Sequence, residues 1–447
     1  MTTEEEKKLG KQIVLEIEKS VEWVKDPVLL QFLDKTGRAL VTQVGPTPFE
    51  FKFYMIHASD PNAFAIPGGH VFVTTGLLVL SESEEEVAGV LSHEISHVTG
   101  RHISRLIEKT KGINYASLAA LVAGVLVGGG GKASEAVAAM ALGLKEAYAL
   151  KYTREMEVDA DQNALQYLLK AGYDPSGLIV FLSKIQKSSI TSSPKIPAYL
   201  STHPAVEDRI SLLENLLLAG RRPAAAFRTG CNFKRIQARA LVEEREPHSA
   251  IDHFQSLVNA NPNDVDGYYG LGLAYRKSGR LDKATEVLER ANALGARDPE
   301  ILRELGIVYF LSGRLDTSIE VLESARSLFE SGPDRNEDLM CLYFLGRGYQ
   351  EKKDFAKALP LFLKVKEDLP EFGEVYLSLG SVYGRTGKKG LSHFYFGKHF
   401  KLRREKENAL LHFRTALEWL EKGGAERLEA EREIKELTES KPPERRG

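Results

Sequence analysis

Cysteine is scarce in this chain, and neither sign of charge is in excess. Cys231 and Cys341 are the only cysteines among 447 residues, too few for a zinc ribbon or a disulfide framework, although the two could form one bridge. Lysine and arginine number 60 against 62 aspartates and glutamates, so the net charge is −2. Because no basic field exists to attract a polyanion, we expect no nucleic-acid partner.

A long hydrophobic run is also missing. The longest small and apolar stretch, 116–127, has 12 residues before a run of glycines, whereas a helix that spans a bilayer needs about 20. We expect this stretch to form a packed helix, a lid or a peripheral contact with a membrane surface. The first ten residues, MTTEEEKKLG, hold no apolar signal region. They predict either a cytoplasmic protein or the mature form of an exported one.

The remaining composition is that of a globular protein, with 43% hydrophobic and 27% charged residues. The length predicts two to four domains. Residues 1–217 mix helical patterns with a strand-rich patch, and later residues repeat one helical pattern. We predict an α+β domain with a small sheet at 1–217, a linker at 218–230, an all-α solenoid at 231–420 and a charged tail at 421–447.

The solenoid is predicted from a recurring Gly-x-x-Tyr pattern, in which a small residue follows each glycine by twelve positions. Each outer pair of copies is 34 residues apart, and the middle gap is 40. This period, with small residues where two helices of a hairpin approach closely, is typical of tetratricopeptide repeats. The four pairs are Gly272 and Tyr275, Gly306 and Tyr309, Gly346 and Tyr349, and Gly380 and Tyr383.

Weaker copies around Ala238 and Ala409 bring the expected number of repeats to about six. Stacked repeats of this kind form a curved solenoid, and we expect a protein partner on its concave face. The alternative is a scaffold for packing or oligomerisation, because a repeat fold does not specify its ligand. The tail is predicted to be a frayed helix followed by disorder.

A metal-binding pattern occurs in the first half. Ser83 and Glu86 form a capping box at the start of a helical pattern. His93 and His97 therefore lie on one face of a helix, within reach of one metal, and Glu94 lies beside them where it can take a proton from an attacking water. This is the His-Glu-x-x-His motif of zinc metallopeptidases; the alternative is a surface helix with two unconnected histidines.

A nearby histidine does not extend this motif. The extended form requires a third histidine at position 103, which is Ile103 here. If the helix continues, His102 lies nine residues after His93 and about 180° away around the helix axis. We therefore assign His102 to the surface or to a structural role.

A third ligand is predicted about sixty residues later. Glu157 and Asp161 are one helical turn apart and share a stripe with Leu165 and Leu168. Both carboxylates should therefore point toward the core, where an unpaired charge is costly. We predict Glu157 as the third zinc ligand and Asp161 as the acceptor that orients a ligand histidine. The alternative is a solvated acidic run.

These residues resemble a known family. The His-Glu-x-x-His motif, followed by YTREMEVDAD at 152–161, is similar to the HtpX and CAAX-prenyl-protease family of zinc metallopeptidases. Thr153 replaces the family's usual serine. The segment NAFAIPGGHVFV at 62–73 and the sequence Thr202-His203-Pro204, with Arg209, also resemble family motifs. Together with the added repeats, they make the chain most similar to the periplasmic, BepA-like branch, which implies a periplasmic location.

The resemblance gives His203 and Arg209 catalytic roles. His203 either approaches zinc and blocks it in a latent state, or stabilises the oxyanion together with Arg209. The alternative for His203 is a helix-entry residue before Pro204.

The strand-rich patch suggests a place for substrate. Pro67 prevents full pairing and Gly68-Gly69 permit close backbone approach, which predicts an exposed sheet edge at Val71–Thr74. A peptide could extend the sheet there; the alternative is a covered edge that only packs. The predicted substrate-binding residues are Gly68, Gly69, His70, Val71, Phe72 and Val73.

The sequence thus predicts a zinc endopeptidase with one Zn²⁺ per chain that acts on protein or peptide substrates. As the resemblance implies, it would control the quality of envelope or outer-membrane proteins and recruit them through its repeats. The alternative is a chaperone or adaptor built on the repeats, with a structural or latent zinc site.

Overall fold

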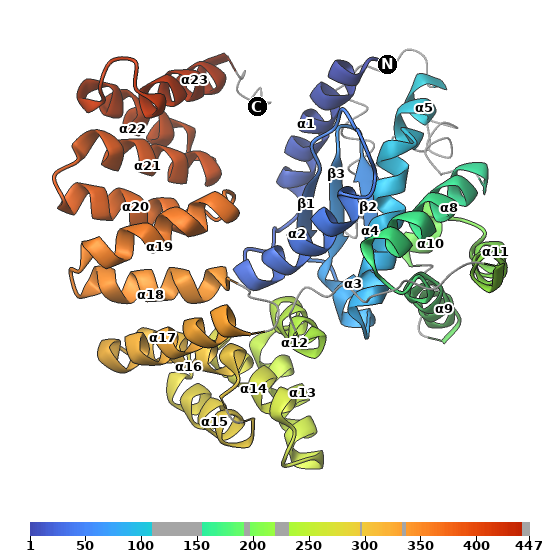
Figure 1. The fold of residues 1–447 in the computed structure, drawn as a ribbon, viewed down its shortest axis with the longest axis horizontal. Helices are drawn as coiled ribbons and strands as arrows, with labels where there is room; N and C mark the ends of the chain where they lie inside the picture. The colour runs from blue at the N-terminus through green and yellow to red at the C-terminus, as the bar shows by residue number, and fades with distance from the viewer. Residues whose placement is uncertain (110–153, 192–196, 220–231, 296, 333–336, 440–447) are drawn as a thin grey trace, which may run out of the picture. The chain divides into compact units, whose positions relative to one another are not determined.

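The computed structural model describes residues 1–109, 154–191, 197–219, 232–295, 297–332 and 337–439 (Figure 1). The predicted 218–230 linker, the glycine-rich run and its flanking helical stretches lie wholly or mainly outside these ranges. The described chain forms two compact units, Met1–Ala260 and Asn261–Gly447. The expected fold is confirmed: a mainly helical unit with a small sheet precedes stacked helical hairpins.

The first unit is built on a sheet of three strands in the order β1-β3-β2. Strands β1 (Lys52–Ile56) and β3 (His70–Thr74) are parallel, and β2 (Ala63–Ile66) is antiparallel to β3. Phe72 at the centre stacks on Tyr54 and on Phe64, each at a ring-centroid distance of 4.8 Å. Helix α1 (Thr3–Ser20) packs Leu9, Ile13 and Ile17 into this apolar cluster.

Helix α2 (Pro27–Val41) contacts the sheet through the other face of β1. Successive side chains of a strand point to opposite faces, so Phe53 points away from the Tyr54 face. A Cβ built at Gly37 would lie 2.3 Å from the Phe53 ring. The absence of a side chain at this position therefore allows the helix to approach the aromatic ring.

The predicted exposed edge at Val71–Thr74 is wrong. The proline and two glycines, 67–69, form the turn of a hairpin between β2 and β3. Strand β3 is therefore central and pairs with a neighbour on both sides. All its residues are buried, as are those of β2, so none of the six residues predicted to bind substrate lies on an open edge.

Helix α4 (Glu84–Thr99) follows the sheet and the short α3 (Thr75–Leu80). Ser83 caps it by accepting a hydrogen bond from the Glu86 backbone N–H. The helix packs against β2, α8 (Arg154–Ala171) and α9 (Ser176–Thr191). A Cβ built at Gly89 would lie 2.7 Å from the backbone nitrogen of Leu178 in α9, so two backbones touch there. This contact fixes the depth of the helix that carries the histidine motif.

The first unit ends later than the predicted linker. Helix α12 (Phe233–Glu244) packs onto α2 and α3, and α13 (Pro247–Ala260) completes the unit. The amide of Gln237 donates to the carbonyl oxygens of Val79, at 3.0 Å, and Ser81, at 2.8 Å. The weak copy around Ala238 is thus a helical hairpin that belongs to the first compact unit.

The second unit is a stack of helical hairpins. In each of the four Gly-x-x-Tyr copies, a Cβ added to the glycine would come within 2.5–2.7 Å of a side chain sixteen residues later, on the partner helix. This explains the glycine at each closest approach. The hairpins are α14 (Val265–Lys277) with α15 (Leu281–Leu294), α16 (Pro299–Leu311) with α17 (Leu315–Ser331), α18 (Leu339–Glu351) with α19 (Phe355–Asp368), α20 (Gly373–Arg385) with α21 (Lys389–Leu402), and α22 (Lys406–Trp419) with α23 (Ala425–Glu439).

The charged tail contains a folded helix. Helix α23 packs on α22 and α21, with Ala430 fully buried. Lys398 of α21 pairs with Glu429 and Glu433 of α23 at 2.8 and 3.0 Å. The last hairpin therefore extends to Glu439. Among the described residues, no helix is both long and apolar enough to cross a bilayer.

Candidate metal centre

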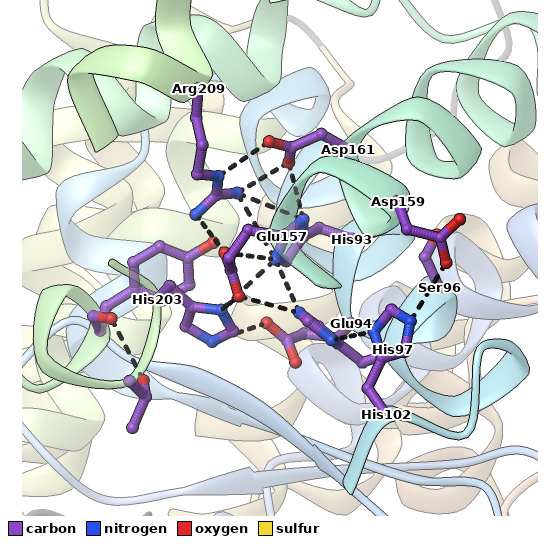
Figure 2. A network of polar contacts seen from close by, with 12 residues as sticks. His93, Glu94, Ser96, His97, His102, Glu157, Asp159, Asp161, His203 and Arg209 are labelled. Carbon is purple, nitrogen blue, oxygen red and sulfur yellow. Dashed lines mark hydrogen bonds and ion pairs between the residues drawn. The ribbon is translucent and has the colours of Figure 1, made fainter. Parts of the chain in front are cut away.

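Four buried side chains converge in the first unit (Figure 2). His93 and His97 lie one turn apart on α4, and Glu157 lies in the first turn of α8. His203 ends the short helix α10 (Ala198–Thr202). One ligand atom from each lies within 4.8 Å of the others, and each residue is at most 2% exposed. The three residues predicted as ligands are thus brought together, with His203 as a fourth member.

The spacing of these atoms fits a tetrahedral metal. Bonds of about 2.0–2.2 Å from a tetrahedral zinc to nitrogen and oxygen place the ligand atoms roughly 3.3–3.6 Å apart. Each of the two histidine Nε2 atoms lies 3.5 Å from one of the two oxygens of Glu157, within this range, and the Nε2 atoms of His93 and His97 are slightly closer to each other, at 3.0 Å. Two neutral imidazoles and a carboxylate form a common catalytic zinc donor set. The residues therefore fit a metal ion by both chemistry and spacing.

Asp161 binds the Nδ1 atom of the His93 ring. A carboxylate oxygen of Asp161 lies 2.8 Å from His93 Nδ1, which leaves Nε2 to face the cluster. Burial and the Arg209 charge each lower the pKa of His93, but the carboxylates of Asp161 and Glu157 outweigh them and raise it to about 9. Asp161 thus occupies the place predicted for an acceptor that orients a ligand histidine.

Arg209 connects the two carboxylates of α8. Its Nε and Nη2 each donate to Asp161 at 2.8 Å, and its Nη1 lies 2.7 Å from Glu157. Burial alone would raise the pKa of Glu157, yet Arg209 and His203 hold it well below its usual range. The guanidinium is therefore engaged in fixing Glu157 and Asp161, whereas the resemblance gave it a role at an oxyanion.

His102 is not on the surface. Helix α4 ends at Thr99, and Arg101 adopts a left-handed conformation with φ of 53°, so the chain turns before α5 (His102–Lys109). The assumption of a continuous helix was wrong, and His102 is 1% exposed. Its Nδ1 lies 2.8 Å from His97 Nδ1, and its Nε2 lies 3.1 Å from Asp159. Burial lowers the pKa of both histidines.

Glu94 lies at the cluster without a hydrogen-bond donor among the described residues. Both of its carboxylate oxygens are buried and unsatisfied, and His203 Nε2 lies 3.4 Å from one of them. Burial raises the pKa of Glu94 despite the neighbouring histidines. A buried carboxylate kept unsatisfied next to a metal-binding group is suited to accept a proton during a reaction.

His203 lies among the ligand atoms rather than beside them. Its Nδ1 is 3.1 Å from Glu157 and 3.3 Å from His93 Nε2. The ring of Tyr199, which is fully buried, stacks on the His203 ring at a centroid distance of 4.4 Å. Neither Tyr199 nor Asp159 was predicted from the sequence to belong to the site. Asp159 stood in the acidic run, but nothing in the sequence distinguished Tyr199.

Comparisons with known proteins agree with this geometry. Residues 31–217 match Peptidase family M48, and residues 237–299 and 298–371 match the tetratricopeptide repeat. A putative beta-barrel assembly-enhancing protease of Vibrio cholerae is 30% identical over 279 residues, or 59% of this chain and 55% of that protein. The beta-barrel assembly-enhancing protease of Escherichia coli is 31% identical over 212 residues, or 47% of this chain and 43% of that protein.

A mitochondrial metalloendopeptidase of Schizosaccharomyces pombe is 27% identical over 186 residues, or 42% of this chain and 52% of that protein. The chain spans about half the length of these curated relatives. The family match covers the whole cluster, because all four metal-facing residues lie between 31 and 217. Residues 31–217 are therefore similar to the peptidases of family M48, and residues that match the tetratricopeptide repeat follow them.

Proposed function

We propose that the protein is a zinc-dependent endopeptidase of protein substrates. The observation that carries this proposal is the buried group of two imidazoles and one carboxylate at tetrahedral spacing, with the unsatisfied carboxylate of Glu94 beside it. His93, His97 and Glu157 would hold the zinc. When bound, zinc would supply a Lewis acid that polarises a peptide carbonyl and makes water more acidic.

The chain's own groups have distinct tasks in this proposal. Glu94 takes the proton of the attacking water at its carboxylate and delivers it to the leaving amine. Asp161 keeps Nε2 of His93 directed at the cluster by accepting from Nδ1. Arg209 fixes the positions of the Asp161 and Glu157 carboxylates relative to each other and neutralises part of their charge. Each of these roles depends on exclusion of bulk water, which the burial of all these groups supports.

His203 acts as a latency residue in this proposal. Its Nδ1 lies within 3.3 Å of both Glu157 and His93, so it occupies the space that a fourth donor would fill. A substrate carbonyl needs this same space. Cleavage therefore requires the segment that carries His203 and Tyr199 to move, whereas a role at the oxyanion would require His203 to stay.

The repeats recruit the protein clients. The relatives' printed name, beta-barrel assembly-enhancing protease, supports a role in the quality control of outer-membrane proteins. We extend the proposal to the periplasm as the compartment, as the resemblance implies. The alternative function is that of an adaptor in which the repeats bind clients and the metal site stays closed; the insertion of His203 among the ligand atoms favours it.

One experiment separates these functions. Zinc-loaded wild type and Glu94→Gln are incubated with casein, and the zinc content of both proteins is determined. We expect the variant to retain zinc and to lose cleavage by at least about 100-fold, because general-base catalysis contributes about that much or more. Glu155→Gln is the matched control, since Glu155 is an exposed carboxylate of α8.

The proposal fails if zinc-loaded wild type and its His203→Ala variant both leave casein intact. In that case neither latency nor a missing metal explains the absence of cleavage, and the adaptor function is favoured. Equal cleavage by wild type and Glu94→Gln would instead remove Glu94 as the base.

A further inference from the structure

Two hydrogen bonds in series connect the second histidine of the metal centre to a carboxylate on α8 (Figure 2). The first joins the Nδ1 atoms of His97 and His102, and the second joins His102 Nε2 to Asp159. His102 is 1% exposed, while the Asp159 side chain is 53% exposed. The series thus leads from the buried cluster to the protein surface.

The donors and acceptors of this series follow from the chemistry of its ends. An ionised carboxylate only accepts, so His102 must donate its Nε2–H to Asp159. Neutral His102 then has a lone pair on Nδ1 and accepts the Nδ1–H of His97. His97 is left with its lone pair on Nε2, the atom that faces His93 and Glu157. This is the tautomer that binds a metal through Nε2.

The local backbone is shaped to place His102 there. A Cβ built at Gly100 would lie 2.4 Å from His102 Nε2, so any side chain at that position would displace the ring. Arg101 follows in a left-handed conformation with φ of 53°, which is unfavourable for a residue with a side chain. Its guanidinium pairs with Glu6 of α1, a carboxylate that is 1% exposed. The turn is therefore anchored against a second helix.

We propose that His102 is a positioning residue that, with Asp159, fixes the tautomer and the ring orientation of His97 for metal binding. His102 thus orients His97 through its Nδ1 atom, as Asp161 orients His93. The inference rests on the proposed metal site but not on peptidase activity, because its measure is zinc affinity. Partners of ligand histidines of this kind typically affect metal affinity by about 10- to 100-fold.

The test uses two amide variants that retain different atoms of the imidazole. His102→Asn places an acceptor where Nδ1 was, whereas His102→Gln retains only a group near Nε2. Zinc dissociation constants are measured on the full chain by competition with a chromophoric chelator. We expect His102→Gln and His102→Ala to bind zinc about 10- to 100-fold more weakly, and His102→Asn to stay within about threefold of wild type. Asp159→Ala should lose less than His102→Gln.

Two outcomes overturn the proposal. One is zinc affinity within twofold of wild type in all three His102 variants. The other is equal weakening in Ala, Asn and Gln together with a lower melting temperature of the metal-free protein, which indicates a packing role. His248→Ala is the control, because His248 is exposed on α13. Failure of the proposed function would appear separately, as wild type and His203→Ala that both bind zinc but leave casein intact.

Discussion

Asp161 accepts from His93 Nδ1 and from two guanidinium nitrogens of Arg209, each at 2.8 Å. One carboxylate thus orients a metal-facing histidine and is itself held by a buried arginine. In the proposed zinc site, this arrangement would make the zinc affinity sensitive to a residue that does not contact the metal.

The first prediction concerns this carboxylate. Asp161→Asn should weaken zinc binding by about 10- to 100-fold. A neutral amide accepts the His93 Nδ1–H less strongly than a carboxylate does, and Arg209 loses one of its two carboxylate partners. Chelator competition measures the loss. Asp252→Asn, an exposed carboxylate on α13, serves as the control. Unchanged affinity in Asp161→Asn would show that His93 needs no such partner.

The second prediction concerns His203. His203→Ala should raise the rate of casein cleavage by about tenfold, the factor that follows from removing a bias of about 1.4 kcal/mol toward the closed state. Zinc affinity should fall in the same variant, because one nitrogen donor is lost. A lower cleavage rate with unchanged zinc affinity would favour the oxyanion role instead. If neither quantity changes, His203 has no active role.

The third prediction tests the close contact of α4 and α9. Gly89→Ala should lower the free energy of unfolding by about 1–3 kcal/mol, because the new Cβ would lie 2.7 Å from a backbone atom of Leu178. Urea unfolding followed by circular dichroism measures this loss. Gly373→Ala is the matched control, since its Cβ would meet nothing closer than 3.9 Å. Equal stability of both variants would contradict the packing described here.

The fourth prediction concerns pH. Burial, with smaller contributions from Lys52 and Lys11, lowers the pKa of His70 to about 4. Between about pH 6.5 and pH 4, His70 is therefore protonated in the unfolded chain but neutral in the folded protein. The free energy of unfolding consequently falls as the pH drops through this window. The loss contributed by His70 is at most about 3 kcal/mol.

The variant His70→Asn isolates this contribution. Its amide oxygen can still accept from the Tyr54 hydroxyl, which lies 2.9 Å from His70 Nδ1. The free energy of unfolding of zinc-loaded wild type should decline more steeply than that of the variant between pH 6.5 and pH 4. Parallel curves would mean that His70 does not titrate in this range.

Local patterns predicted the parts of the site that lie on single helices. The spacing of His93 and His97 defines one helical face, and the same rule applies to Glu157 and Asp161. The glycines of the repeats were likewise recognisable, because close helix contacts recur at a fixed period.

The features that the sequence analysis missed depend on where an element stops. His102 was placed on the far side of a helix that ends at Thr99, and a single left-handed residue, Arg101, reverses its direction. An exposed edge was predicted at Val71–Thr74, whereas Pro67 begins the turn of a hairpin and β3 pairs with a neighbour on both sides. Tyr199 is recognised only from its tertiary contact with His203. Such contacts between distant segments leave no periodic signal in the sequence.

Three carboxylates at alternate positions of α8, Glu157, Asp159 and Asp161, reach the metal centre by different routes. A rotation of this helix by one residue would withdraw all three together. In the proposed zinc site, retention of the ion would therefore report on the docking of α8, because a chain in which α8 has docked incorrectly lacks Glu157 as a ligand and Asp161 as the partner of His93.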